Sequence, residues 1–181
     1  MKQKIGFIGG LISASVIVAF AVYLATHNIP QNVVSWIMWA VLDSIILIGC
    51  FAAGNKQPWI PAGFVLGACL VTIILLMKGV WRWDTIETIS AIGIAIALVC
   101  WWKLGAKPAI VASTIATVIA GIPAMHDAWL QPNYASWWLW SGIAFGCTFS
   151  LYGVKKWSIE DHLFPCSTFV FGVIMTILVL R

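Results

Sequence analysis

The sequence predicts an all-α membrane protein, a seven-helix bundle built as three helices, one linking helix and three more helices. Hydrophobic residues make up 62% of the 181-residue chain and charged residues only 9%. Soluble domains carry about 25% charged residues, so this chain lacks the polar surface that a water-soluble fold needs. Twelve tryptophans agree with this prediction, because Trp concentrates where lipid tails meet headgroups. An internal repeat then divides the bundle into its units.

Each predicted helix is an apolar stretch close to the ~20 residues that cross a hydrocarbon core. Proline, asparagine and charged residues separate these stretches. Because the breaks are short, we expect consecutive helices to be antiparallel neighbours. The predicted spans are residues 5–26, 33–54, 60–79, 85–104, 109–129, 133–154 and 164–180.

The first two helices begin in different ways. Lys2 and Lys4 precede an apolar run from Ile5 to Ala25, a pattern that also suits a signal peptide. The run exceeds the ~7–15 residues of a signal-peptide core and completes a repeat, so we interpret it as a helix. Asn32 precedes the second helix and is a suitable N-cap.

Polar residues also mark the starts of the later helices. Asp84 followed by Glu87 predicts a capping box for the fourth helix. The seventh helix is expected to begin only after a solvated loop that holds Glu160, Asp161 and His162. Small residues along several helices suit close helix contacts. These glycines are Gly9, Gly10, Gly63, Gly67, Gly93 and Gly172.

A repeat is visible where the second and sixth helices open. Residues 32–39 and 133–140 both follow the pattern N-x-x-S-W-x-x-W. Chance matching in a Trp-rich chain is the alternative, but segment order, length and proline placement also agree. The third and seventh helices correspond at Pro61, Gly67 and Thr72 and at Pro165, Gly172 and Thr176.

The repeat predicts the domain organisation. Residues 1–80 form the first three-helix unit, residues 81–108 a linker helix, and residues 109–181 the second unit. A single linking helix gives both units the same orientation, so the expected arrangement is a parallel repeat with a pseudo-two-fold axis along the membrane normal.

The layout and its short motifs resemble a known superfamily. Ile29-Pro30-Gln31 precedes the second helix, and Ile122-Pro123, Trp129 and Pro132 to Ser136 occur in the second half. These features resemble the PQ-loop superfamily, which includes the SWEET sugar transporters.

The opening from Asn133 to Trp140, with Tyr152-Gly153 at the far end, looks more like the bacterial vitamin transporters of the nicotinamide riboside (PnuC) type. The second half departs from the pattern, since it has Gln131-Pro132 in place of Pro-Gln. The resemblance implies transport of a vitamin-, nucleoside- or sugar-like solute across a bacterial plasma membrane.

Lysine distribution predicts the orientation. Seven lysines lie on the side of the N-terminus, and three basic residues lie on the other side, so the positive-inside rule favours a cytoplasmic N-terminus. This orientation is opposite to the usual SWEET topology. The first group is Lys2, Lys4, Lys56, Lys103, Lys107, Lys155 and Lys156, and the second is Lys78, Arg82 and Arg181.

The candidate substrate site centres on Asp43. At ~1.5 Å per residue from the Asn32 cap, Asp43 lies ~16 Å deep, near the midplane of a ~30 Å core. Trp36, Trp39 and Asp43 are spaced i, i+3, i+7 and share one helix face. Such a stripe suits an aromatic or cationic solute.

In the second repeat the matching positions are Trp137, Trp140 and Ala144. They predict a similar aromatic wall, with Ala144 in place of the acid. Asn32 and Asn133, which open the two repeats, complete the candidate site. For Trp36 and Trp137 an interfacial anchor is the preferred interpretation. For Asp43 the alternative is a protonated acid bonded to a neighbouring hydroxyl.

The leading hypothesis is a small-solute transporter or facilitator that works by rocking of the two units around a central site. The alternative is a structural or assembly subunit of a membrane complex without transport activity. The expected partners are a small solute and membrane lipids, with a homo-oligomer left open.

Other classes find little support. No nucleic-acid partner, cofactor, metal or catalytic residue is predicted, and the chain is not expected to be an enzyme, because it lacks paired intramembrane carboxylates and hydrolase motifs. The cysteines fall in apolar runs without a CxxC, and we interpret them as packing residues. They are Cys50, Cys69, Cys100, Cys147 and Cys166.

Overall fold

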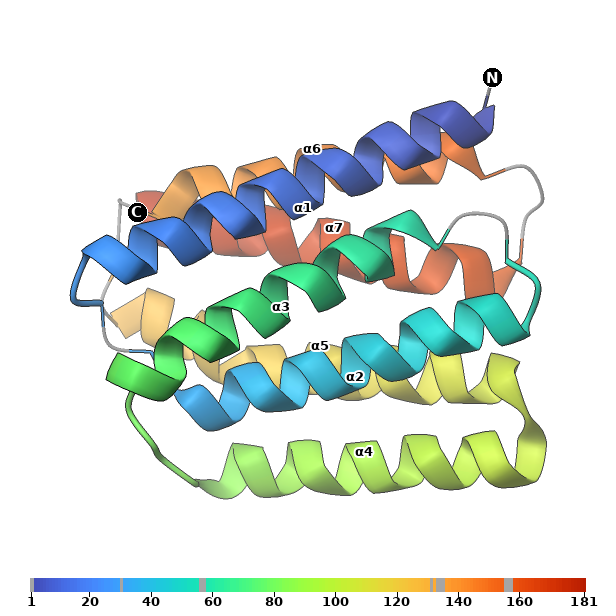
Figure 1. The fold of residues 1–181 in the computed structure, drawn as a ribbon, viewed down its shortest axis with the longest axis horizontal. Coiled ribbons are helices and arrows are strands. Elements are labelled where there is room, and N and C mark those ends of the chain that lie inside the picture. The colour runs from blue at the N-terminus through green and yellow to red at the C-terminus, as the bar shows by residue number, and fades with distance from the viewer. Residues whose placement is uncertain (1, 30, 56–57, 131, 133–135, 155–157) are drawn as a thin grey trace.

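Seven helices make up the protein in a computed structural model that describes residues 2–29, 31–55, 58–130, 132, 136–154 and 158–181 (Figure 1). No strand occurs in these ranges. The helices are α1 Lys2–Thr26, α2 Val33–Ala52, α3 Trp59–Lys78, α4 Thr85–Leu104, α5 Ala106–Leu130, α6 Trp137–Gly153 and α7 Ile159–Leu180.

Six of these helices are long and apolar enough to cross a membrane. The exception is α6, which has 17 residues, and the start predicted for it at residue 133 lies outside the described residues. The predicted all-α membrane bundle is therefore confirmed.

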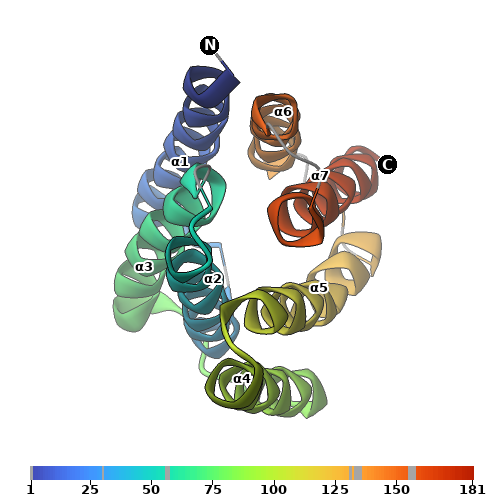
Figure 2. The same cartoon turned by 90° about the vertical axis from the view of Figure 1, so that its right-hand side faces the viewer.

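The helices α1, α3, α2, α5, α7 and α6 pack in that order into a closed ring. The linker helix α4 lies outside this ring (Figure 2). We call the first three-helix unit, α1 to α3, the first triplet, and the second unit, α5 to α7, the second triplet. Within the first triplet α3 packs between α1 and α2, and within the second α7 packs between α5 and α6. The triplets meet along two seams, where α1 packs against α6 and α2 packs against α5. The linker α4 packs against α5 and α2. This order of contacts is the same in both triplets.

One expectation about neighbours is wrong. α1 and α2 are consecutive, but α3 separates them, and α7 likewise separates α5 from α6. The short loop between α1 and α2 still permits this arrangement, because an extended residue spans up to ~3.6 Å and neighbouring helix axes lie ~8–10 Å apart. Loop length therefore limits the distance between the ends of two consecutive helices, but it does not by itself make these helices pack against each other.

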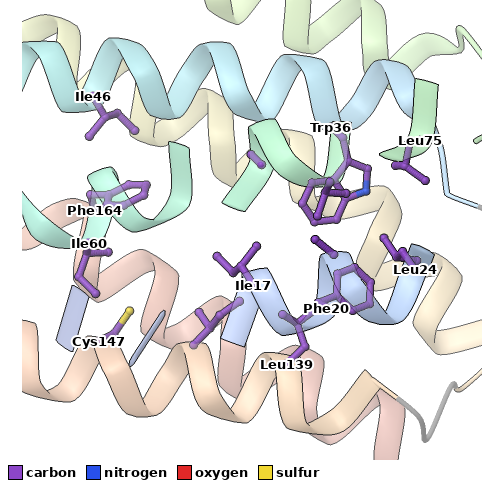
Figure 3. Packing of buried hydrophobic residues seen from close by; sticks show 14 of the residues in the cluster. Ile17, Phe20, Leu24, Trp36, Ile46, Ile60, Leu75, Leu139, Cys147 and Phe164 are labelled. Carbon is purple, nitrogen blue, oxygen red and sulfur yellow. The ribbon is translucent and has the colours of Figure 1, made fainter. Parts of the chain in front are cut away.

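Glycines allow the seam between α1 and α6 to close. A Cβ atom built on Gly9 would lie 2.5 Å from the carbonyl oxygen of Gly146 and 2.8 Å from the nitrogen of Ser150. Around this seam a cluster of buried apolar side chains joins both triplets, including Ile17, Leu139 and others drawn in Figure 3. Each of the six glycines predicted to lie in close helix contacts has neighbouring atoms within 3 Å of the Cβ position.

The seventh helix begins earlier than predicted, at Ile159 instead of residue 164. Ser158 is its N-cap and accepts a hydrogen bond from the backbone nitrogen of Asp161 at 3.3 Å. Glu160 pairs with Lys107 at the start of α5. Acidic residues are favourable in the first turn of a helix, so the stretch expected to be a solvated loop is helical.

The fourth helix begins as predicted. The Glu87 carboxylate accepts a hydrogen bond from the backbone nitrogen of Asp84 at 2.9 Å, and the capping box is formed.

Candidate functional site

A cavity lies between the two triplets. It is lined from α1, α2 and α3 on one side and from α5, α6 and α7 on the other, and no described residue of α4 contributes. Its volume, counted as the space open to the centre of a water molecule, is about 70 Å³. The lining residues are Ile17, Trp36, Trp39, Asp43, Phe64, Ala68, Thr117, Val118, Leu139, Trp140, Ile143, Phe164, Ser167, Thr168 and Phe171.

Asp43 is the acidic group of this cavity. It lies in the middle of α2, is only 2% exposed, and its Oδ1 atom has no hydrogen-bond partner among the described residues. The alternative of an acid bonded to a neighbouring hydroxyl therefore finds no support at this atom. Buried polar groups normally have partners, so an unpartnered carboxylate oxygen marks a place where a ligand can bind.

Trp39 lies one turn before Asp43 and also lines the cavity. Its indole Nε1 is buried without a hydrogen-bond partner in the described part of the chain. Trp39 meets Trp36 edge to face, with ring centroids 5.2 Å apart and planes at 82°. The i, i+3, i+7 stripe predicted on this helix thus faces the cavity as one unit.

Trp36 is not the interfacial anchor that its position near a helix start suggested. Its side chain is buried, stacks against Phe20 of α1 at 6.1 Å, and lines the cavity. The Gln31 side chain accepts a hydrogen bond from its Nε1 at 3.2 Å. Gln31 therefore satisfies the polar atom of this indole and fixes the ring at one end of the cavity.

Further aromatic rings come from three other helices. Trp140 of α6 contacts Phe171 of α7 edge to face at 5.5 Å, and Phe64 of α3 contacts Phe164 of α7 in the same manner at 5.7 Å. The second triplet thus supplies aromatic rings opposite the stripe of Asp43.

Hydroxyl groups add polarity on the side of the second triplet. Thr117 donates to the carbonyl oxygen of Ser113 at 2.9 Å, and Ser167 donates to that of Phe164 at 2.9 Å. Because a hydroxyl oxygen keeps acceptor capacity after it donates, these groups can still accept a hydrogen bond from a solute.

Those of the remaining predicted residues that the structure describes do not line the cavity. Trp137 is 48% exposed at the start of α6, where an anchoring role fits it. Ala144 is buried but does not line the cavity, so the second repeat supplies Trp140 alone of its predicted wall. Asn133 lies outside the described residues.

Asn32 acts as a capping residue. Its Oδ1 accepts from the backbone nitrogen of Val34 at 3.1 Å, and its Nδ2 donates to Glu87 at 2.7 Å and to the carbonyl oxygen of Arg82 at 3.0 Å. Its side chain does not line the cavity, and these bonds leave it little capacity for a solute.

Sequence reasoning missed the cavity residues outside the two Trp-rich helices. Phe64, Phe164, Phe171, Thr117 and Ser167 sit in apolar stretches where the sequence looks the same whether a side chain faces lipid or a cavity. The pairing of α3 and α7 in the repeat was a signal for Phe64, Phe164, Phe171 and Ser167, whereas no signal pointed to Thr117 on α5.

Comparison of the chain with family models, curated proteins and solved structures finds no match. The resemblance to the PQ-loop superfamily therefore stays an expectation from the motifs. Among the described residues no three His, Cys, Asp or Glu side chains gather as metal ligands would.

Proposed function

We propose that this protein is a small-solute membrane transporter or facilitator, in which the solute occupies the cavity between the triplets. The cavity lining carries this proposal, because helices of both triplets contribute to it. Relative movement of the triplets would change access to such a site from one side of the membrane to the other.

The unpartnered polar atoms support binding at this place. A charged residue in the middle of a membrane span costs about 2.5–3.5 kcal/mol on insertion scales and commonly marks a substrate pathway. Asp43 Oδ1 and Trp39 Nε1 both lack partners among the described residues. A solute that bonds to both would satisfy them, whereas a scaffold has no need of unpaired groups at its centre.

Uptake by proteoliposomes tests the proposal. The purified protein is reconstituted and screened with labelled vitamins, nucleosides, sugars and small amines. For a transported solute, Asp43→Asn should lower the initial rate at least about tenfold, since a lost charged hydrogen bond is worth ~1.5–3 kcal/mol. Trp39→Ala should also lower the rate, because it removes an indole ring and its N–H donor from the lining.

Trp81→Ala provides the matched control, because Trp81 is exposed in the loop between α3 and α4. This variant should keep the native rate. Native rates in both cavity variants, measured on folded protein, would show that the cavity is not the transport site.

A further inference from the structure

We infer that the solute bound in this cavity is a small organic cation with a single charge, held by Asp43 and enclosed by aromatic rings. This inference rests on the proposed function and names its solute class.

The charged side chains of the cavity lining indicate the sign of the charge on the ligand. Of the fifteen lining residues, Asp43 is the one with an ionisable side chain in the membrane interior, and none is Lys, Arg or His. The described ion pairs, Arg82 with Asp84 and Lys107 with Glu160, lie at the ends of the helices. No side chain of the lining therefore supplies a charge that complements the Asp43 carboxylate, whereas a cationic ligand would. An anion would meet a carboxylate here with nothing to offset the repulsion.

The aromatic rings favour an organic cation over a metal ion. Six of the lining residues are Trp or Phe, and the face of such a ring attracts a cation, most strongly where water is excluded. The edge-to-face pairs, Trp36 with Trp39 and Trp140 with Phe171, turn ring faces in different directions, as enclosure of a cation requires.

Ca²⁺ or Mg²⁺ would need six or more oxygen ligands. The side-chain oxygens of the lining are one carboxylate, of Asp43, and three hydroxyls, of Thr117, Ser167 and Thr168, so water would have to supply the rest of the coordination shell in this apolar cavity.

The volume limits the size of the ligand. A water molecule needs ~10–15 Å³ by this measure, so the cavity volume of about 70 Å³ accommodates roughly five water molecules. A quaternary ammonium group or a single ring is of this size. A complete nucleoside would require the triplets to move apart.

Binding of matched probes to the purified protein tests the inference. Choline and N-methylpyridinium carry one dispersed charge, and 3,3-dimethylbutan-1-ol has the shape of choline with carbon in place of nitrogen. Isothermal titration calorimetry should show choline binding at least about tenfold more tightly than the neutral alcohol, a difference of ~1.4 kcal/mol. This comparison uses the unaltered chain, so it does not depend on the folding of a variant.

Two variants then test whether Asp43 is the residue that causes the preference for choline over the neutral alcohol. Asp43→Asn keeps the shape and removes the charge, so choline should bind no better than the alcohol. Asp161→Asn makes the same chemical change in the first turn of α7, outside the cavity lining, and should keep the preference for choline. Equal binding of choline and the alcohol by the native protein, or an undiminished preference in Asp43→Asn, would overturn the inference.

Transport measurements separate this inference from the proposed function. Uptake of a neutral solute that is lowered by Trp39→Ala but unaffected by Asp43→Asn would overturn the cation inference and support transport. Choline that binds with the expected selectivity but never enters proteoliposomes would support the cation site and contradict transport of this solute class.

Discussion

Asp43 places a carboxylate where it lowers the stability of the empty protein. It is 2% exposed, and its Oδ1 has no partner in the described ranges. Replacing it by an apolar side chain of similar volume should therefore stabilise the solute-free bundle. We expect Asp43→Leu to raise the free energy of unfolding by roughly 1–3 kcal/mol, since functional sites are commonly held at a cost in stability. Thermal unfolding in detergent measures this change.

Asp43→Asn is the matched control for that experiment, because it removes the charge but leaves an amide to be satisfied. The increase in the free energy of unfolding should be smaller for Asp43→Asn than for Asp43→Leu. A loss of stability in Asp43→Leu would mean that the carboxylate holds the helices together, which contradicts its assignment as a ligand group.

At the residue scale the sequence singled out Asp43, Trp39 and Trp36, and all three line the cavity. Asp43 is conspicuous because charged residues are rare in apolar helices, and the i, i+3, i+7 spacing joined it to Trp39 and Trp36. Apolar residues carry no comparable signal, so Phe64 and Phe171 could not be distinguished from lipid-facing residues. Asn32 was predicted to be a site residue, but it does not line the cavity. A polar residue beside a helix start can serve equally as a cap or as a ligand contact, and the sequence does not distinguish the two.

At the element scale, the Glu87 carboxylate at the start of α4 forms hydrogen bonds that connect this helix to the start of α2. Glu87 accepts hydrogen bonds from Asn32 Nδ2 at 2.7 Å, from Ser35 Oγ at 2.8 Å and from the backbone nitrogen of Asp84 at 2.9 Å. Val80, the residue directly before the linker, also bonds through its backbone to Val33 and to Gln31. The linker is therefore joined to the first triplet at this end as well as packed against α5.

Removing the Glu87 carboxylate should loosen this end of the linker. We expect Glu87→Ala to lower the free energy of unfolding by at least about 2 kcal/mol, because three donors lose a charged acceptor. Hydrogen exchange should rise first in the opening turns of α4 and α2. Thermal unfolding and exchange mass spectrometry measure the two effects.

Glu87→Gln is the control, since it keeps an oxygen acceptor and should lose less stability. A double-mutant cycle with Asn32→Ala isolates the interhelical bond. Additive losses in that cycle would show that Asn32 and Glu87 do not act together.

The helices themselves were largely predictable, because hydropathy and breaking residues report directly on membrane spans. The start of α7 was not, since Glu160 and Asp161 look like loop residues until the dipole of the helix and the partner Lys107 are considered. The order of helices within each triplet was also unpredictable. Which helix lies in the middle depends on complementary surfaces, such as Gly63 against Gly10 and Ala14, and on no local pattern.

At the scale of the whole molecule, the cavity follows from how the triplets meet. Each triplet places its third helix in the middle and offers its first and second helices to the partner triplet. The two seams, α1 with α6 and α2 with α5, lie on opposite sides of the ring of helices (Figure 2). The cavity is lined from all six helices of this ring. A movement that tightens one seam can loosen the other, which is the geometry a rocking mechanism needs. Superposition of residues 5–80 on 109–181 as same-handed units remains a prediction.

The orientation of this bundle in the membrane is the last prediction. Seven helices place the two termini at opposite ends of the bundle, as Figure 1 shows. Lys2, Lys4, Lys103 and Lys107 belong to the end of the N-terminus, whereas Arg82 and Arg181 belong to the other. By the positive-inside rule, a reporter fused before residue 1 should be cytoplasmic and one fused after residue 181 should face outward.

Charge substitutions make this experiment decisive. Lys2→Gln with Lys4→Gln removes positive charge beside the first span and should increase the fraction of inverted chains, while Lys2→Arg with Lys4→Arg should leave the orientation unchanged. An outward N-terminus in the native protein would contradict the assignment and give the usual SWEET orientation. The end of the bundle where Glu87 fastens the linker, together with Trp36 and Gln31, would then face the cytoplasm instead of the outside.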